Sequence, residues 1–229
     1  MRVTLENKQI LAAVAPFATW IALQTLLPTT AWAYALRSCA TLSVLLASLP
    51  IIRGVIQRHH NTNIHLFYHI LFGGLGGFLV LALWTLPEFS AFYQTWCVWP
   101  LGSPPKISTD PSPYQPEVCG WSLTTAKLIG SAFVIAPVEE LFFRSFLYRW
   151  LQKKDFGAIP FSTFDPSAFA WTVFLFTLEH NRPLAAALCA VIYGFLSIRL
   201  GLLSAVMAHI TTNLLLAVYV ISWNQWAFW

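Results

Sequence analysis

Long apolar runs separated by short polar breaks make up most of the chain. An α-helix needs about 20 mostly apolar residues to cross a bilayer. The runs that we expect to cross, one of them short, are residues 10–27, 31–52, 65–86, 121–150, 167–178, 184–198 and 202–221. This pattern predicts an all-α polytopic membrane protein with about seven transmembrane helices, within a range of about six to eight.

Composition separates the chain from water-soluble proteins. Hydrophobic residues make up 57% of its 229 residues and charged residues only 10%, against about 25% charged residues in soluble domains. The mean hydropathy is +0.63. We therefore expect one integral membrane domain over residues 1–229. Residues 1–120 would hold N-terminal spans and an outside loop, and residues 121–229 the spans that carry the chemical motifs.

The basic residues indicate an orientation in the membrane and not a nucleic-acid surface. The formal charge is +4, but Lys and Arg are spread between apolar runs and form no basic face. Loops on one side would hold Arg2, Lys8, Arg53, Arg58, Arg149, Lys153, Lys154 and Arg199, and loops on the other only Lys106 and Arg182. By the positive-inside rule we expect a cytoplasmic N-terminus and an outside C-terminus, with the bacterial inner membrane as the location.

Several residues outside the main motifs carry structural expectations. Cys97 and Cys119 fall in the long loop of residues 87–120, where a disulfide is one alternative and two free thiols are the other. Gly73 and Gly77 form a GxxxG pair in the third span, which predicts a close helix crossing. Arg37, near the start of the second span, is expected to snorkel toward the interface.

Three ionisable residues lie close together inside the mainly apolar run 128–150. Glu139, Glu140 and Arg144 fall within about two helical turns, and unpaired charges at membrane depth cost several kcal/mol. Glu140 and Arg144 are spaced i,i+4, so they share a helix face and can pair. Glu139 is turned about 100° away and needs another partner, a proton or a wet pocket. It could serve as a general base, and a structural ion cluster between helices is the equally weighted alternative.

Two later runs carry polar residues at the same i,i+4 spacing. Phe176 precedes His180 at the end of a short run, where a lone His is more often structural than catalytic. His209 and Asn213 share one face near the middle of an apolar helix, where uncompensated polar groups cost about 1–3 kcal/mol each. Both can donate to an oxyanion, and hydrogen bonding between helices is the alternative explanation.

These groups together supply the chemistry of peptide hydrolysis. A carboxylate and an imidazole can activate a water, and a second imidazole with an amide can stabilise the tetrahedral intermediate. No Ser or Cys nucleophile has a base at a suitable spacing, so water is the expected attacking group and no cofactor is required. Zinc held by Glu and two His is the variant, although the chain has no HExxH.

The ordered set Glu139-Glu140-x-x-x-Arg144, Phe176-x-x-x-His180 and His209-x-x-x-Asn213 resembles the CPBP family, also called Abi or CAAX prenyl endopeptidase type II, of intramembrane proteases. The resemblance covers residues 137–213. It implies a glutamic protease without a required metal, in which His209 and Asn213 form the oxyanion site. The size, the Trp-rich loop and the Cys pair also resemble a bacterial branch associated with C-terminal sorting signals, the JDVT-CTERM type.

The resemblance also implies roles for the other four polar residues. Glu139 and His180 would activate the water. Glu140 with Arg144 would orient the site, and Glu140 is a second candidate for the base. The expected position of His180, near the outside end of its run, sets a geometric condition. His180 and Glu139 share a water only if the fifth span is short, tilted or displaced.

The leading hypothesis is thus an intramembrane endopeptidase that cuts near the C-terminus of a membrane-anchored protein or peptide. Its partners would be that substrate and the lipid bilayer, without nucleic acid, and the sequence does not indicate an oligomeric state. The alternative is a non-enzymatic membrane protein with a bacteriocin-immunity or scaffold role, in which the same residues hold helices together. A transporter comes third, because we find no inverted repeat.

Overall fold

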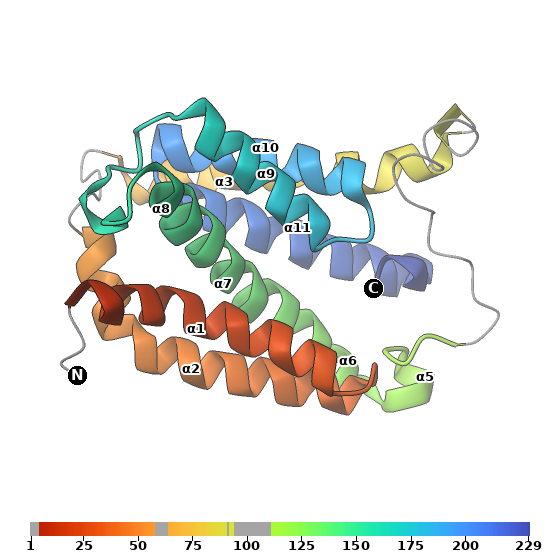
Figure 1. Cartoon of the computed structure of the whole chain (residues 1–229). Helices are drawn as coiled ribbons and strands as arrows, with labels where there is room; N and C mark the ends of the chain where they lie inside the picture. Colours follow the sequence, from red (N-terminus) through yellow and green to blue (C-terminus); the bar gives the residue numbers. More distant parts are fainter. Residues whose placement is uncertain (1–4, 58–63, 91, 94–110) are drawn as a thin grey trace.

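The structure, a computed structural model, describes residues 5–57, 64–90, 92–93 and 111–229. Within these ranges five helices are long and apolar enough, by length and composition, to cross a membrane. They are α1 (Leu5–Leu26), α2 (Ala31–Gln57), α3 (Leu66–Thr85), α10 (Pro183–Leu200) and α11 (Leu202–Trp223). In Figure 1 the beginning of α1 and the end of α2 lie at one end of the molecule, and the beginning of α6 and the C-terminus at the other.

Residues 121–152 form a further continuous helical rod. It consists of α6 (Trp121–Ile129), α7 (Ala136–Glu140) and α8 (Tyr148–Gln152), joined by two π-helical segments, Gly130–Ile135 and Leu141–Leu147. π-Helical turns are rare and occur frequently at functional sites. The short α-helical piece between the two π-helical segments carries both glutamates of the first motif.

α9 (Pro166–Leu178) is short, with 13 residues. Asp165 caps its beginning, because the carboxylate accepts a hydrogen bond from the backbone N–H of Ala168 at 2.7 Å. With α9 and the rod, every run that we expected to cross the membrane corresponds to a helix. The chain is therefore an all-α polytopic membrane protein, as its sequence predicted.

The remaining described elements are single turns or little more. They are η1 (Leu86–Phe89), α5 (Pro116–Cys119), η5 (Phe156–Ala158) and η6 (Trp226–Phe228). Cys97 lies outside the described residues, so the disulfide between Cys97 and Cys119 stays a prediction. Arg2, Arg58 and Lys106, which contributed to the predicted orientation, also lie outside them.

α3 and α11 cross closely, as the GxxxG pair predicted. A Cβ added to Gly73 would lie 2.6 Å from the Cβ of Met207, and one added to Gly77 would lie 2.5 Å from the carbonyl oxygen of Ala208. Both distances are shorter than real Cβ contacts. The two glycines therefore allow the backbones of α3 and α11 to touch.

We expect Gly77→Ala to lower the free energy of unfolding by about 1–3 kcal/mol, because the added methyl group must separate α3 from α11. Gly74→Ala is the matched control, since a Cβ at Gly74 would meet no atom within 4 Å. Thermal unfolding in detergent measures both variants. Equal unfolding temperatures for the two would contradict the close crossing.

Arg37 does not snorkel, which corrects the sequence-based expectation. Its side chain is 6% exposed, and the guanidinium carbon lies 4.9 Å from the ring centroid of Trp20 and 5.3 Å from that of Tyr34. Aromatic faces attract a guanidinium when it loses water. The rings from α1 and α2 thus hold inside the protein a charge that we expected at the membrane interface.

Two arginines that the sequence suggested as loop charges are also buried. Arg149 is 0% exposed, and its Nε donates to the carbonyl oxygen of Ile159 at 2.7 Å. Arg182 is 4% exposed and forms an ion pair with Glu88 at 3.0 Å. The Arg182 guanidinium also donates to the carbonyl oxygen of Ala227. This second arginine joins the end of α3, the α9–α10 connection and the C-terminal turn.

Candidate active site

A cavity of about 130 Å³, the inner cavity, lies between the rod, α9, α10, α11 and the end of α3. Four of the six candidate residues line it, namely Glu139, His180, His209 and Asn213. The other lining residues are Trp84, Phe176, Cys189, Tyr193, Thr212 and Leu216. Because α9 is short, its C-terminal end brings His180 to the same cavity as Glu139. The geometric condition set by the sequence is therefore met.

Glu140 and Arg144 pair as their spacing predicted, and they also join another helix. Arg144 Nη1 lies 3.1 Å from Glu140 Oε1, with the two side chains 2% and 0% exposed. The same carboxylate oxygen lies 2.9 Å from His209 Nδ1. Arg144 Nη2 also donates to the carbonyl oxygen of Ala190 at 3.4 Å. Charges this deeply buried persist only when they are paired and hydrogen-bonded, so Glu140 and Arg144 anchor α11 and α10 to the rod.

The His209 ring is held by a hydrogen bond at Nδ1 and by an aromatic ring on one face. A carboxylate can only accept, so His209 donates to Glu140 through Nδ1, and Nε2 then lies 3.8 Å from Glu139 Oε2. Tyr193 stacks on the ring with centroids 4.9 Å apart. The Tyr193 hydroxyl donates to Thr212 Oγ1 at 2.7 Å. A second proton on Nε2 would place an imidazolium between two carboxylates.

His180 presents one ring nitrogen to the inner cavity. Its Nδ1 lies 2.8 Å from the carbonyl oxygen of Phe176, which can only accept, so Nδ1 carries the hydrogen and Nε2 keeps its lone pair. The ring stacks on Phe176 at 4.5 Å and meets Trp84 edge-on at 5.7 Å. His180 lies in the α9–α10 connection, where burial lowers its pKa to about 4. The imidazole is therefore neutral near pH 7 and able to accept a proton.

Asn213 links α11 to the rod. Its Nδ2 donates to the carbonyl oxygen of Ser131 at 2.9 Å, within the first π-helical segment. An amide nitrogen carries two N–H groups, so the second stays available to an oxygen atom in the cavity. Asn213 thus forms the bond between helices that was one of the two alternatives left by the sequence, and the role of its second N–H as a donor at the site stays a prediction.

Glu139 is the least satisfied of the candidates. It is 6% exposed, and among the described residues its Oε2 has no hydrogen-bond partner. It also lines a second cavity of about 380 Å³, the entrance cavity, which shares Glu139, His180, Asn213 and Leu216 with the inner cavity. Gln24 and Asn181 line the entrance cavity and are exposed, so the entrance cavity opens at the surface beside the inner cavity.

Glu179 is a carboxylate of this region that the sequence analysis missed. It lines the entrance cavity together with Glu139. It lies in the α9–α10 connection, and burial raises its pKa to about 7. An acidic residue directly before the motif histidine, at the end of an apolar run, was the signal that could have identified it. Tyr193 and Thr212 gave no such signal, because their roles depend on contacts between helices.

The raised pKa of Glu179 predicts a pH-dependent contribution to stability. Between the ordinary pKa of a glutamate, about 4.5, and the folded value of about 7, the folded protein binds the proton more tightly, so stability falls as pH rises. We expect Glu179→Gln to raise the unfolding temperature at pH 8 relative to wild type and to remove that difference near pH 4.5. Thermal unfolding at both pH values measures it. Glu117→Gln, at an exposed position, is the control, and an effect of equal size there would contradict the prediction.

The site does not include a ready metal cluster among the residues that the structure describes. No group of three or more His, Cys, Asp or Glu side chains is arranged there to hold a metal ion. The ionisable side chains instead contact one another in series: Arg144 pairs with Glu140, Glu140 with His209, and His209 with Glu139. One oxygen of Glu140 contacts both a guanidinium and an imidazole. Such an arrangement can position an imidazole and leave one carboxylate free to exchange a proton.

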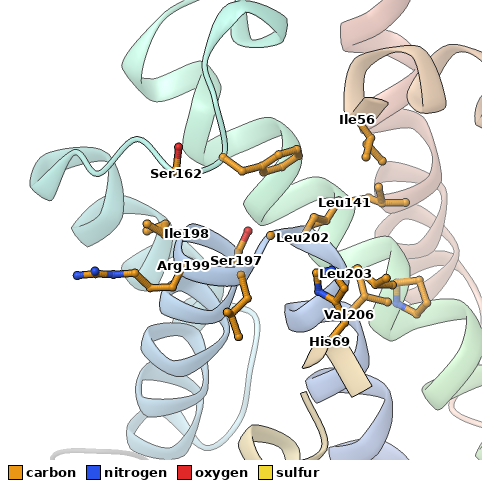
Figure 2. A pocket seen from close by; sticks show the side chains of 14 residues that line it. Ile56, His69, Leu141, Ser162, Ser197, Ile198, Arg199, Leu202, Leu203 and Val206 are labelled. Atoms are coloured by element: carbon orange, nitrogen blue, oxygen red, sulfur yellow. The ribbon is translucent and has the colours of Figure 1, made fainter. Parts of the chain in front are cut away.

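A larger cavity, of about 530 Å³, lies at the turn between α10 and α11 (Figure 2). Its lining is mainly apolar and includes Ile56, Leu141 and Val206, with His69 and Pro137. Figure 2 shows the Arg199 guanidinium turned away from the other labelled side chains. None of the six candidate residues lines this cavity. The smaller inner cavity, which four of them line, is therefore the candidate active site.

Comparison with known proteins gives a match over the part of the chain that forms the site. Residues 121–215 match the family described as type II CAAX prenyl endopeptidase Rce1-like. The matched segment contains all six candidate residues, the rod, α9, α10 and most of α11. No curated protein and no solved structure matches the chain significantly.

Proposed function

We propose that the chain is a membrane protease of the type II CAAX prenyl endopeptidase Rce1-like family, whose model residues 121–215 match, and that it hydrolyses a peptide bond near the C-terminus of a membrane-associated protein. The observation that supports this most is the convergence of Glu139, His180, His209 and Asn213 on the inner cavity. A family resemblance alone would not require these four side chains to meet.

In the proposed reaction, a water in the inner cavity is held by Glu139 and by the free Nε2 of His180. Glu139 takes one proton from the water while the oxygen attacks the carbonyl carbon of the scissile peptide bond. The resulting tetrahedral intermediate carries its charge on the former carbonyl oxygen. When the carbon–nitrogen bond breaks, Glu139 returns the proton to the leaving amine. All atoms and charges are then balanced, and the carboxylate is ready for another cycle.

The developing oxyanion is stabilised by two donors from α11. The second N–H of Asn213 supplies one hydrogen bond, and an N–H at Nε2 of His209 supplies the other. Glu140 and Arg144 do not touch the substrate in this proposal. They hold the His209 ring through its Nδ1 and leave Nε2 directed toward Glu139. Glu140 and Arg144 therefore act as positioning residues. In this proposal Glu139, and not Glu140, is the general base.

Cleavage of membrane-anchored peptides tests the proposed function. Purified wild-type protein in lipid vesicles is given a panel of peptides that differ in their C-terminal segments, and products are identified by mass spectrometry. We expect a new C-terminus from the wild type and none from His180→Ala prepared in the same way. Equal cleavage by both proteins would point to a contaminating protease and overturn the proposal.

We also propose that the reaction needs no metal ion. The proton transfers are assigned to Glu139, the positioning of the water to Glu139 and His180, and the stabilisation of the oxyanion to His209 and Asn213. We therefore expect cleavage to continue after treatment with 1,10-phenanthroline and dialysis into metal-free buffer. A loss of activity that Zn²⁺ restores would instead support the zinc variant.

The non-enzymatic alternative receives less support from the geometry. Residues that only join helices are expected to pair with one another, as Glu140 Oε1 and Arg144 Nη1 do, although Glu140 Oε2 and Arg144 Nε have no hydrogen-bond partner among the described residues. Glu139 instead faces two adjoining cavities, and its ion pair among the described residues is with His209 at 3.8 Å. A scaffold role gives no reason to bury this carboxylate beside an imidazole.

For the cellular setting we propose a bacterial inner membrane, with a cytoplasmic N-terminus, and a place in the JDVT-CTERM-type branch. The loop charges support this orientation. The entrance cavity is lined by Trp229 and by Lys127 of α6, at the end of the molecule where the C-terminus lies (Figure 1). In this orientation it faces the outside. Reporter fusions at the C-terminus, active only outside the cytoplasm, would test it.

A further inference from the structure

A lysine side chain, Lys127, lines the entrance cavity far from the candidate catalytic carboxylate of Glu139. Glu139 lies where the entrance cavity meets the inner cavity, and Lys127 lines the entrance cavity from α6. Both residues belong to the continuous rod of residues 121–152. At about 1.5 Å per residue, their Cα atoms are roughly 18 Å apart along the rod axis. The cavity therefore extends from an acidic and imidazole-lined region to a basic one.

Lys127 lies among aromatic rings and not beside an acid. Its Nζ is 4.0 Å from the ring centroid of Tyr34, 4.8 Å from that of Tyr114 and 5.8 Å from that of Trp229. No ion pair among the described residues includes Lys127. Aromatic faces stabilise an ammonium group only partly compared with a carboxylate. The ammonium group is thus held in place and left able to bind an anion.

Arg37 adds a second positive charge to the same aromatic cluster. Its guanidinium lies over Trp20 and Tyr34, and its Nε has no hydrogen-bond partner among the described residues. None of the described carboxylates forms an ion pair with it. Two cations that share the Tyr34 ring repel each other, and an anion bound between or beside them would relieve that repulsion.

We propose that Lys127, with the rings around it, forms a subsite that binds a carboxylate of the substrate's C-terminal segment. This inference rests on the proposed endopeptidase function. The carboxylate could be the free C-terminus or an acidic side chain close to it. An extended peptide covers about 3.3–3.6 Å per residue, so roughly four to six residues would separate the scissile bond from the bound carboxylate.

Three versions of a cleaved peptide test the subsite. The first ends in a free carboxylate, the second in an amide, and the third in an amide that follows an Asp. We expect wild-type protein to cut the first peptide with a kcat/KM roughly 10- to 100-fold higher than the second, mainly through KM. If the third peptide regains the rate, an acidic side chain can replace the free C-terminus in the subsite, and if it does not, the subsite requires the free C-terminus.

Substitutions of Lys127 test the same subsite from the side of the protein. Lys127→Met should cut the acid and the amide at similar rates, and Lys127→Arg should keep most of the preference. Lys153→Met is the matched control, because Lys153 is exposed and lies beyond α8 at the opposite end of the rod. This variant should prefer the acid peptide over the amide peptide as strongly as wild type does. Adding residues at the C-terminus should move the cut, so that the length of the C-terminal product stays constant.

The outcomes separate this subsite from the proposed function. Cleavage of all three peptides at equal rates by wild type would overturn the subsite and leave the endopeptidase function standing. An unchanged preference in Lys127→Met would also overturn it. Absence of any cleavage by wild type would remove the endopeptidase function, and the subsite with it.

Discussion

Replacing Glu139 by Gln is expected to lower kcat by about 10²- to 10⁴-fold, the usual contribution of a positioned general base. Gln has nearly the same shape as Glu but cannot take a proton from the water. The substitution also removes a negative charge from a side chain that is only 6% exposed. We therefore expect the unfolding temperature of the variant to equal or exceed that of wild type. Peptide cleavage and thermal unfolding on one preparation measure the two effects.

Glu139→Gln distinguishes a structural role of Glu139 from a catalytic one, because the two roles predict different effects on activity and on stability. If Glu139 only holds helices together, Glu139→Gln should change stability and activity in parallel. If it is the base, activity should fall while stability does not. KM should change little, because the proposal gives Glu139 no contact with the substrate before the water attacks. Glu117→Gln, at an exposed position, controls for the loss of one negative charge, and equal activities of the two variants would refute the role.

The apolar periodicity and the polar spacing predicted most of the fold, the pair of Glu140 with Arg144, and four candidate residues that line the inner cavity. Glu140 and Arg144 pair because their i,i+4 spacing needs only a helix, a local property. Gly73 and Gly77 allow a close crossing for an equally local reason, since only their small size matters. The sequence also indicated that Glu139 would need another partner than Arg144, a proton or a wet pocket. In the structure, Glu139 lies beside the His209 imidazole and lines two cavities.

What the sequence could not predict depends on contacts between distant segments. Arg149 reads as a loop charge, and only the fold reveals that the carbonyl oxygen of Ile159 accepts its Nε–H. Arg37 reads as a snorkelling residue, and only the packing of α1 against α2 supplies the rings that cover it. Lys127 drew no attention for the same reason, because two of its three rings come from segments distant in the sequence.

Breaking the buried ion pair should have the largest effect on stability. Arg144→Met leaves Glu140, which is 0% exposed, with the His209 ring as its remaining hydrogen-bond partner. We expect this to cost about 3–5 kcal/mol of unfolding free energy, as is usual when one partner of a buried pair is removed. Cleavage should be lost as well, because the Glu140 carboxylate is no longer held where it orients His209. Chemical unfolding in mild detergent and the peptide assay measure the two effects.

The double variant Glu140→Gln with Arg144→Met distinguishes a buried charge from lost packing. It removes both charges, while the Gln side-chain oxygen can still accept from His209 Nδ1. If the cost of Arg144→Met comes from the uncompensated carboxylate, the double variant should be more stable than Arg144→Met alone, with a coupling energy of about 0.5–3 kcal/mol. Strictly additive losses would mean that the ion pair contributes nothing beyond the volume of its side chains. Recovery of stability together with part of the cleavage activity would show that Glu140 acts by positioning His209, and that the base lies elsewhere, at Glu139.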